Sequence, residues 1–244
     1  MRVIKLTVAY DGTDFAGWQR QARHRTVQAV IEDALEPIAG RPVVIHGAGR
    51  TDAGVHAAGQ VASLILERPI APADLCRALN ARLPDDVRVM AAEEAAPDFH
   101  ARFMARLKTY HYRVCTLPVL PPLERRTAWH VRGPLDEAAM ARAAAALVGE
   151  HDFASFQAAG SAVRSTVRTL TRSAVIAEAT GLRYEVAGTG FLRYMVRAIV
   201  GTLVEVGRGR RAPDDLPAIL AARDRASAGL TAPPQGLVLH GVEY

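Results

Sequence analysis

The chain has 244 residues, half of them hydrophobic, and a formal net charge of +5. A chain of this length can bury one large core or two modest ones, and its positive balance suits an anionic partner. Its two cysteines cannot form a disulfide framework, its histidines show no metal-ligand spacing, and no apolar run approaches the roughly 20 residues that span a bilayer. We therefore expect a cytoplasmic protein without a metal site or a membrane segment.

Strands and helices are predicted to alternate in the first half of the chain. Residues 4–8 alternate apolar and polar side chains, as a strand does. Thr26 is placed to cap a helix whose apolar face runs from Val27 to Ile38 and which ends at Gly40. Further elements are expected as strands over 43–45, 61–66 and 87–91 and as a short helix over 74–83.

The second half is predicted to follow a similar order. Strands are expected over 109–114, 167–176, 182–186 and 236–244. Helices are expected from Asp136 to near Gly149, over 192–203 with a clear 3.6-residue period, and from near Pro213. This order predicts an α+β fold of two similar subdomains, residues 1–104 and 105–244, with mostly antiparallel sheets packed into one continuous unit.

The segment HGAGRTDAGVHAAGQV (46–61) places four glycines around Arg50 and Asp52. Glycine permits positive φ and close approach of another backbone, so Asp52 is expected on a tight turn rather than along a helix or strand. One interpretation is a turn in which Asp52 hydrogen-bonds its own backbone, and the other is a reactive carboxylate. A phosphate-binding loop is excluded, because no Lys-Ser/Thr pair follows and the full GxGxxG spacing is missing.

Motifs spread in order over nearly the whole chain point to one family. They are YDGTDFAGWQRQ (10–21) with TVQ (26–28), GRTDAGVHA (49–57), LNARLPDDV (79–87), DFHARF (98–103), YHYRV (110–114), FLRYMVRAIVGTLVEVG (191–207) and GLVL (236–239). Together they resemble the tRNA pseudouridine synthase A family. The resemblance implies the pseudouridine synthase fold, a homodimer, and an enzyme that isomerises uridine to pseudouridine at positions 38, 39 and 40 in the anticodon arm of tRNA, without a cofactor.

The resemblance also implies roles for individual residues. Asp52 is implied to be the catalytic carboxylate, acting once the uridine has been flipped out of its stack. Arg50 is implied to support the displaced nucleotide, Tyr110 to stack on the uracil, Arg197 to pair with Asp52, and Leu237 to line the uracil pocket. From the residues alone, plainer interpretations stay open: a surface ion pair for Arg50, packing for Tyr110 and Leu237, and a solvated charge for Arg197.

Basic side chains are candidate phosphate contacts. The candidates are Arg20, Arg23, His24, Arg25, Arg102, Arg106, Lys108, Arg164, Arg168 and Arg172, with the 208–211 loop as a similar case. Each could equally be a solvated charge. The alternative function is a non-catalytic RNA-binding protein of the same fold, but binding alone would not need Asp52, Tyr110 and Arg197 together. Three positions, Arg193, Tyr194 and Ala198, depart from the family pattern.

Overall fold

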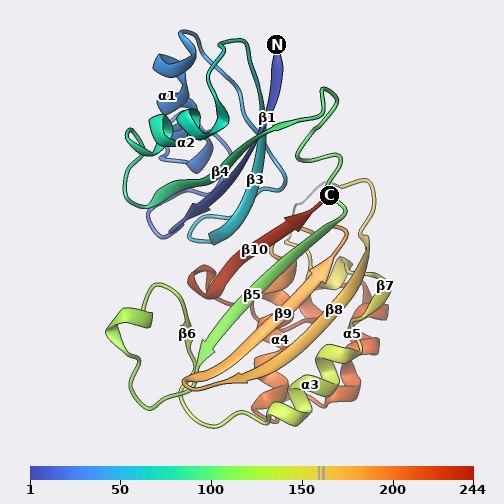
Figure 1. Cartoon of the computed structure of the whole chain (residues 1–244). Coiled ribbons are helices and arrows are strands. Elements are labelled where there is room, and N and C mark those ends of the chain that lie inside the picture. Colours follow the sequence, from blue (N-terminus) through green and yellow to red (C-terminus); the bar gives the residue numbers. More distant parts are fainter. Residues whose placement is uncertain (159, 161–162) are drawn as a thin grey trace. The chain divides into compact units, whose positions relative to one another are not determined.

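The computed structural model describes residues 1–158, 160 and 163–244, and the chain divides into two compact units (Figure 1). The first comprises Met1–Arg106 together with Val238–Tyr244, and the second is Leu107–Leu237. The last seven residues therefore belong with the N-terminal unit, whereas the predicted division at 104/105 groups them with the second subdomain. They return because Val238 and Leu239 pair with a strand of the first unit.

The first unit holds an almost wholly antiparallel sheet. Strand β1 pairs antiparallel with both β3 and β4, β2 pairs antiparallel with β3, and β10 pairs parallel with β3. Helix α2 packs on β4, and α1 contacts α2. The elements are β1 (Arg2–Tyr10), α1 (Val27–Ala39), β2 (His46–Gly47), β3 (His56–Leu66), α2 (Pro72–Asn80), β4 (Val87–Ala95) and β10 (Leu237–Glu243).

Local sequence signals account for the first two elements. In β1, Ile4, Leu6 and Val8 are fully buried while the intervening side chains are half-buried, which is the alternation of a strand with one face on the core. The Thr26 side chain accepts a hydrogen bond from Ala29 N at 3.4 Å and so caps α1. Gly40, with φ of 77°, ends that helix in the left-handed conformation. The predicted boundaries of α1 are confirmed.

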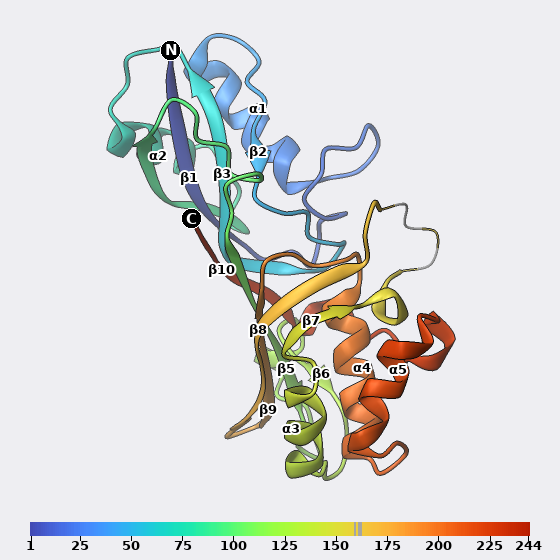
Figure 2. The same cartoon turned by 90° about the vertical axis from the view of Figure 1, so that its right-hand side faces the viewer.

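The strands of the second unit carry helices on one face (Figures 1 and 2). Strand β9 pairs antiparallel with β5 and β8, β7 pairs antiparallel with β8, and β6 pairs parallel with β5. Figures 1 and 2 show α3, α4 and α5 together on one side of these strands. The elements are β5 (Leu107–Cys115), β6 (Trp129–His130), α3 (Glu137–Ala145), β7 (Gly149–Asp152), β8 (Val167–Glu178), β9 (Gly181–Gly188), α4 (Met195–Gly207) and α5 (Leu216–Ala222). The prediction of an α+β fold with mostly antiparallel strands is confirmed.

Two predicted elements differ from the structure for identifiable reasons. The strand expected over 43–45 does not form, because two side chains of α1 hydrogen-bond the backbone of Ile45. The Ile45 N–H donates to Glu32 Oε1 at 3.0 Å, and the Ile45 carbonyl accepts from Gln28 Nε2 at 3.2 Å. The helix expected from residue 192 begins at Met195, because Tyr194 adopts the left-handed conformation with φ of 64°. The short strands β6 and β7 lack an alternating pattern and are not predicted from the sequence. Within the described ranges, no helix is long and apolar enough to cross a membrane.

Candidate active site

Residues 11–18 lie directly against the loop that carries Asp52. The N–H of Trp18 donates to the carbonyl of Thr51 at 3.1 Å, and the N–H of Gly54 donates to the carbonyl of Phe15 at 3.2 Å. The two motifs YDGTDFAGWQRQ and GRTDAGVHA, about 40 residues apart in sequence, are therefore parts of one structural unit.

Two glycines make this close approach possible. A Cβ on Gly12 would lie 2.0 Å from the carbonyl oxygen of Val55, and one on Gly17 would lie 2.5 Å from that of Thr51. Gly17 also has φ of 96°, a conformation that L side chains rarely adopt. Any side chain at either position would have to displace backbone of the loop. These glycines are thus required by the loop that they face.

Asp52 itself stands on a tight turn. The N–H of Val55 donates to the carbonyl of Asp52 at 3.1 Å, and Gly54 has φ of 78°. Asp52 is half-buried. This placement agrees with the turn expected from the glycine spacing, and a carboxylate held in this way is accessible to a substrate.

A buried hydroxyl pair ties the loop to the core strand beside it. Oγ1 of Thr51 lies 2.8 Å from the phenolic oxygen of Tyr10, and both side chains are buried. Burial raises the pKa of Tyr10 to about 12, while its hydrogen bond to Thr51 acts in the opposite direction. The phenol is therefore protonated at neutral pH, and the pair holds the residue next to Asp52 in place.

His56 fixes the other end of the loop. Its Nδ1 accepts a hydrogen bond from Gly12 N at 3.0 Å and lies 3.1 Å from Oδ1 of Asp11. The ring therefore joins residues 11 and 12 to the Asp52 loop through Nδ1, and its second nitrogen is Nε2. That Nε2 is buried and has no hydrogen-bond partner among the described residues. The sequence singles out His56 only as part of the loop motif, and its glycine partner is a tertiary contact.

Arg50 is oriented by a residue that the sequence does not single out. Its Nε donates to Oε1 of Gln19 at 3.0 Å, and Gln19 in turn donates to Oε1 of Gln28 at 2.8 Å. Arg50 is exposed. Because the Gln19 amide is neutral, this contact orients the Arg50 guanidinium without cancelling its positive charge. A group that supports an anionic ligand needs that charge.

The remaining predicted site residues belong to the second unit. Tyr110 lies on β5 opposite Val186 of β9, is 7% exposed, and packs edge-on against Phe191 with ring centroids 5.0 Å apart. Leu237 opens β10 and is 5% exposed. Both side chains are buried, so the packing interpretation and a role in a pocket wall are both compatible with their surroundings.

Arg197 is not the solvated charge that its place on the helix suggests. Its Nε donates to the carbonyl of Ala232 at 2.7 Å, and its own carbonyl accepts from Ala232 N at 3.0 Å. Its guanidinium carbon lies 4.7 Å from the ring centroid of Tyr194, and that of Arg193 lies 4.8 Å from the same ring. Arg197 is half-buried. Tyr194, one of the positions that depart from the family pattern, thus packs against a predicted site residue.

Carboxylates already occupy at least two of the candidate phosphate contacts. Arg20 pairs with Glu32 and Asp33, each at 2.6 Å, and Arg25 forms a two-pronged contact with Asp86 at 2.7 and 2.9 Å. Such charged pairs are shorter and stronger than neutral hydrogen bonds. The guanidinium groups of Arg20 and Arg25 therefore have a structural role within the first unit. Of the other candidates, Arg23 and Arg106 are exposed, Lys108 and Arg168 are half-buried, and burial lowers the pKa of Arg168.

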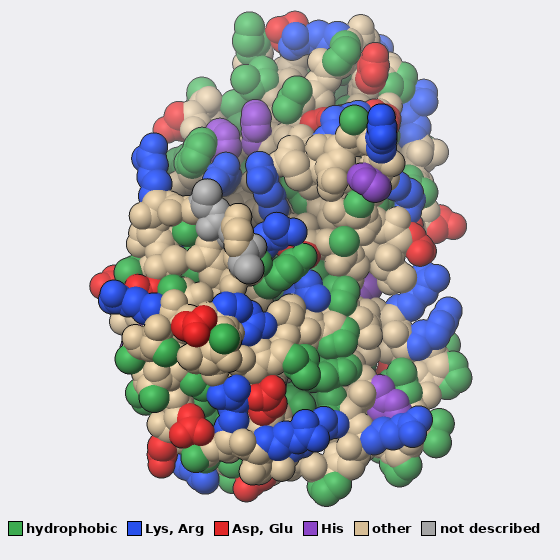
Figure 3. Space-filling model, turned by 180° about the vertical axis from the view of Figure 1, so that it is seen from behind, with side chains coloured by type: hydrophobic (Ala, Val, Ile, Leu, Met, Phe, Trp, Pro, Cys, Tyr) green, Lys and Arg blue, Asp and Glu red, His purple; other side chains and the backbone are tan. Residues whose placement is uncertain are grey.

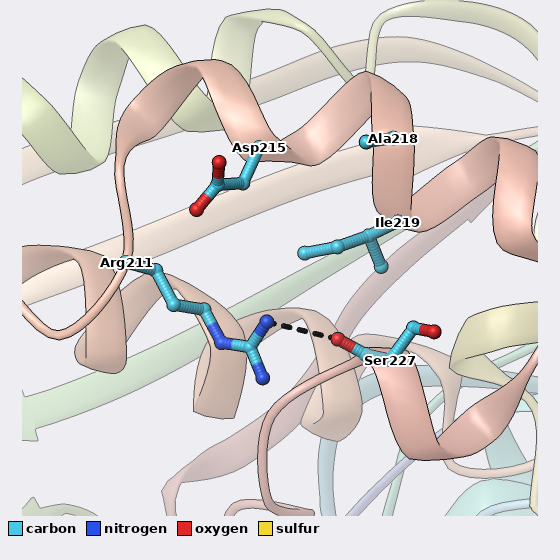
Figure 4. A pocket seen from close by; sticks show the side chains of 5 residues that line it. All are labelled: Arg211, Asp215, Ala218, Ile219 and Ser227. Carbon is cyan, nitrogen blue, oxygen red and sulfur yellow. Dashed lines mark hydrogen bonds between the residues drawn. The ribbon is translucent and has the colours of Figure 1, made fainter.

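The 208–211 loop is anchored through Arg211. Its Nη1 donates to the carbonyl of Ser227 at 2.9 Å (Figure 4). Its Nε pairs with Glu205. The guanidinium lines a pocket of about 340 Å³ together with Asp215, Ala218, Ile219 and Ser227. At least one arginine of this loop is therefore structural.

Positive charge is widely distributed over the surface. Lys and Arg side chains recur over the whole face shown in Figure 3, with acidic side chains between them. Over the described part of the chain, no group of three or more His, Cys, Asp or Glu side chains is arranged to hold a metal ion. An anionic ligand on the face shown in Figure 3 would meet many separate cations.

Comparison with known proteins identifies the family. A family model described as tRNA pseudouridine synthase matches residues 6–104 and 143–244. The tRNA pseudouridine synthase A of Moorella thermoacetica is 49% identical over 246 residues, covering 100% of both chains. Those of Syntrophotalea carbinolica and Solidesulfovibrio magneticus are 46% and 50% identical, covering 100% of this chain and 97% and 92% of theirs. With a family model that matches most of its length and full-length similarity to these enzymes, the chain belongs to the tRNA pseudouridine synthase family.

Proposed function

We propose that this chain isomerises uridine to pseudouridine at positions 38, 39 and 40 in the anticodon arm of tRNA, with Asp52 as the catalytic carboxylate. The observation that carries the proposal is the Asp52 turn, which is clamped by residues 11–18, by the Tyr10–Thr51 pair and by His56. Family membership over the full chain supports the same reaction.

The chemistry needs one carboxylate and no group donor. The N1–C1′ glycosidic bond breaks, the base turns, a C5–C1′ bond forms, and the proton lost from C5 is balanced by one gained at N1. Asp52 serves either as a nucleophile or as a base, and both roles require its carboxylate form. The target nucleotide leaves its stack before either step.

The other predicted residues have supporting roles in this proposal. Arg50, exposed and oriented by Gln19, contacts the displaced nucleotide, and Tyr110 stacks on the uracil. Arg197, held by Ala232 and Tyr194, pairs with the Asp52 carboxylate, and Leu237 lines the uracil pocket. We further propose a homodimer that works in the cytoplasm, in which one subunit holds the tRNA body while the other presents Asp52. Sedimentation of a fully active monomer at working concentration would contradict the dimer.

The test separates chemistry from binding. Asp52→Asn keeps the size and an acceptor oxygen but can neither add to the substrate nor take a proton, so pseudouridine formation should fall below detection. Affinity for the tRNA should persist, because it comes mainly from phosphate contacts. Asp85→Asn removes one exposed negative charge elsewhere in the first unit and is the matched control, with activity retained. The readout is single-nucleotide mapping of pseudouridine in an unmodified tRNA transcript.

Three results would count against the proposal. Pseudouridine made by Asp52→Asn at more than a trace rate would show that another group performs the chemistry. Loss of tRNA binding together with activity would instead mean that Asp52 mainly holds the turn together. Binding by the parent protein without any pseudouridine formation would favour the non-catalytic RNA-binding alternative.

A further inference from the structure

A row of three rings lies on the first unit and includes none of the residues assigned to the isomerisation. The rings of His46 and His100 are stacked with centroids 5.0 Å apart and planes at 28°. The ring of Phe103 continues the row, 4.4 Å from that of His100. Phe103 is nevertheless 75% exposed, which is unusual for a phenylalanine and leaves the end of the row in contact with water.

This exposed ring stands on an anchored turn. Ala101 is fully buried, its N–H donates to Oγ of Ser63 at 3.1 Å, and its carbonyl accepts from the hydroxyl of Tyr244 at 2.8 Å. The N–H of Met104 donates to the carbonyl of His100 at 3.1 Å and closes the turn. The fold therefore holds Phe103 in the exposed position, and the loss of side-chain freedom on binding is small.

The charged side chains of this turn are one arginine and one aspartate. The Arg102 guanidinium carbon lies 5.6 Å from the ring centroid of Phe103, and Arg102 is exposed. His100 accepts the N–H of Arg102 on Nδ1 at 3.1 Å, and burial, with the nearby His46, lowers the pKa of His100. The His100 ring is thus neutral at pH 7 and suited to stacking. Asp98, also exposed, is the acidic residue of this turn.

We infer that His46, His100, Phe103 and Arg102 form a docking surface for one unpaired base of the substrate RNA. The base stacks on the exposed face of Phe103 and extends the row, while the guanidinium of Arg102 contacts the adjoining phosphate. Aromatic side chains beside cations recognise single-stranded RNA in this manner, and any base has a suitable face. The inference rests on the proposed function for the identity of the RNA as a substrate.

The size of the surface favours a base over a second protein chain. A phenylalanine offers at most about 250 Å² to bury, whereas a stable protein interface needs roughly 800 Å² on each partner. One aromatic face matches the area of one nucleobase. The neighbouring Met104 adds a second partly exposed apolar group, but the rim carries the Arg102 charge that a polyanion neutralises.

The position in the chain limits how far the stacked base lies from the reacting uridine. His46 precedes Asp52 by six residues. At about 3.6 Å per residue for a fully extended chain, their Cα atoms are at most about 22 Å apart. That distance corresponds to about six base steps at 3.4 Å each. The row adds ring spacings of 5.0 and 4.4 Å beyond His46, so the chain sets an upper limit on the separation and leaves the position of the base in the RNA to experiment.

Substitutions at Phe103 test the stacking directly. Phe103→Leu keeps an apolar side chain but removes the π-face, and its Kd for a tRNA transcript should rise roughly 5- to 100-fold. Phe103→Tyr keeps the ring and should stay within about 2-fold of the parent. The salt slope of binding should be unchanged in both, because no phosphate contact is lost. Met90→Ala is the control, since it removes another exposed apolar side chain of the first unit.

An abasic scan of the RNA identifies the partner. Transcripts that each lack one base are bound to the parent and to Phe103→Leu. We expect one position in the RNA at which removing the base weakens binding to the parent protein but not to Phe103→Leu. If the effect of removing a base and the effect of Phe103→Leu on the binding free energy simply add at every position, the inference is overturned. A change of oligomeric state in Phe103→Leu without a position-specific RNA effect would also overturn it, because the surface would then hold a second copy of the chain.

The same experiment distinguishes this inference from the proposed reaction. Phe103 lies outside the catalytic residues, so the single-turnover rate at saturating tRNA should be unchanged in Phe103→Leu. A parent that makes no pseudouridine but shows the base-specific coupling would refute the reaction and leave the docking surface standing. An active parent without that coupling would refute the docking surface alone.

Discussion

Replacing Gly17 by alanine should impair catalysis far more than stability or RNA binding. Gly17 combines two constraints, a φ of 96° and a Cβ position 2.5 Å from the carbonyl oxygen of Thr51. The left-handed conformation alone costs an L residue about 1–2 kcal/mol. Ordinary van der Waals contact begins at 3.4 Å, so the Thr51 carbonyl must move by the difference, 3.4 − 2.5 = 0.9 Å. Thr51 immediately precedes Asp52, and the carboxylate moves with it.

The expected magnitudes follow from that displacement. A misplacement of about 1 Å at a catalytic group costs on the order of 100-fold in rate, so the single-turnover rate should fall about 100-fold. Strain of about 1–2 kcal/mol in a chain of this size should lower Tm by roughly 2–8 °C. The Kd for tRNA should change less than about 3-fold, because the substitution removes no basic side chain.

Gly40→Ala supplies the matched control. Gly40 has φ of 77°, but a Cβ there would have nothing within 4 Å. This variant should lose only the stability that the left-handed conformation accounts for, about 1–2 kcal/mol, and keep its rate. Calorimetry, tRNA binding and single-turnover assays on both variants, with far-ultraviolet circular dichroism to verify folding, make the comparison. Equal rates for Gly17→Ala and Gly40→Ala would refute the claim that Gly17 positions the catalytic loop.

Two further predictions concern buried tyrosines. Tyr110→Phe should lose on the order of 100-fold or more in single-turnover rate if the hydroxyl takes part in proton transfer, which we expect, and a rate near the parent's would restrict Tyr110 to stacking. Because burial raises the pKa of Tyr10 to about 12 from 10.0, the folded chain holds this proton where the unfolded chain releases it. The corresponding stability is complete below pH 10 and is lost between pH 10 and 12, by about 2.7 kcal/mol at most. Tm measured against pH should fall less steeply for Tyr10→Phe, and an identical slope would contradict the assignment.

Much of the fold follows from short-range signals in the sequence. Thr26 and Gly40 bound α1 because capping and left-handed termination depend on residues within one helical turn. The alternation in β1 predicts its buried face for a similar reason, since successive strand side chains point to opposite sides. The glycine spacing around Asp52 likewise predicts a tight turn, and the ordered motifs predict the family.

Contacts between residues far apart in the chain required the tertiary structure. No local pattern shows that side chains of α1 take the Ile45 backbone and prevent a strand there. In the sequence, Arg20 and Arg25 look available to bind phosphate. In the structure both pair with carboxylates, because only the folded chain brings these acidic and basic side chains together.

The loop that carries Asp52 depends on both kinds of information. Its residue types and its turn are determined locally, by glycines that allow positive φ. Its position is determined by Gly12, Gly17 and His56, whose roles exist only because residues 11–18 pack against it. A sequence can specify which groups react through a short motif, whereas the precise placement of those groups comes from long-range packing and hydrogen bonds that no window of the sequence contains.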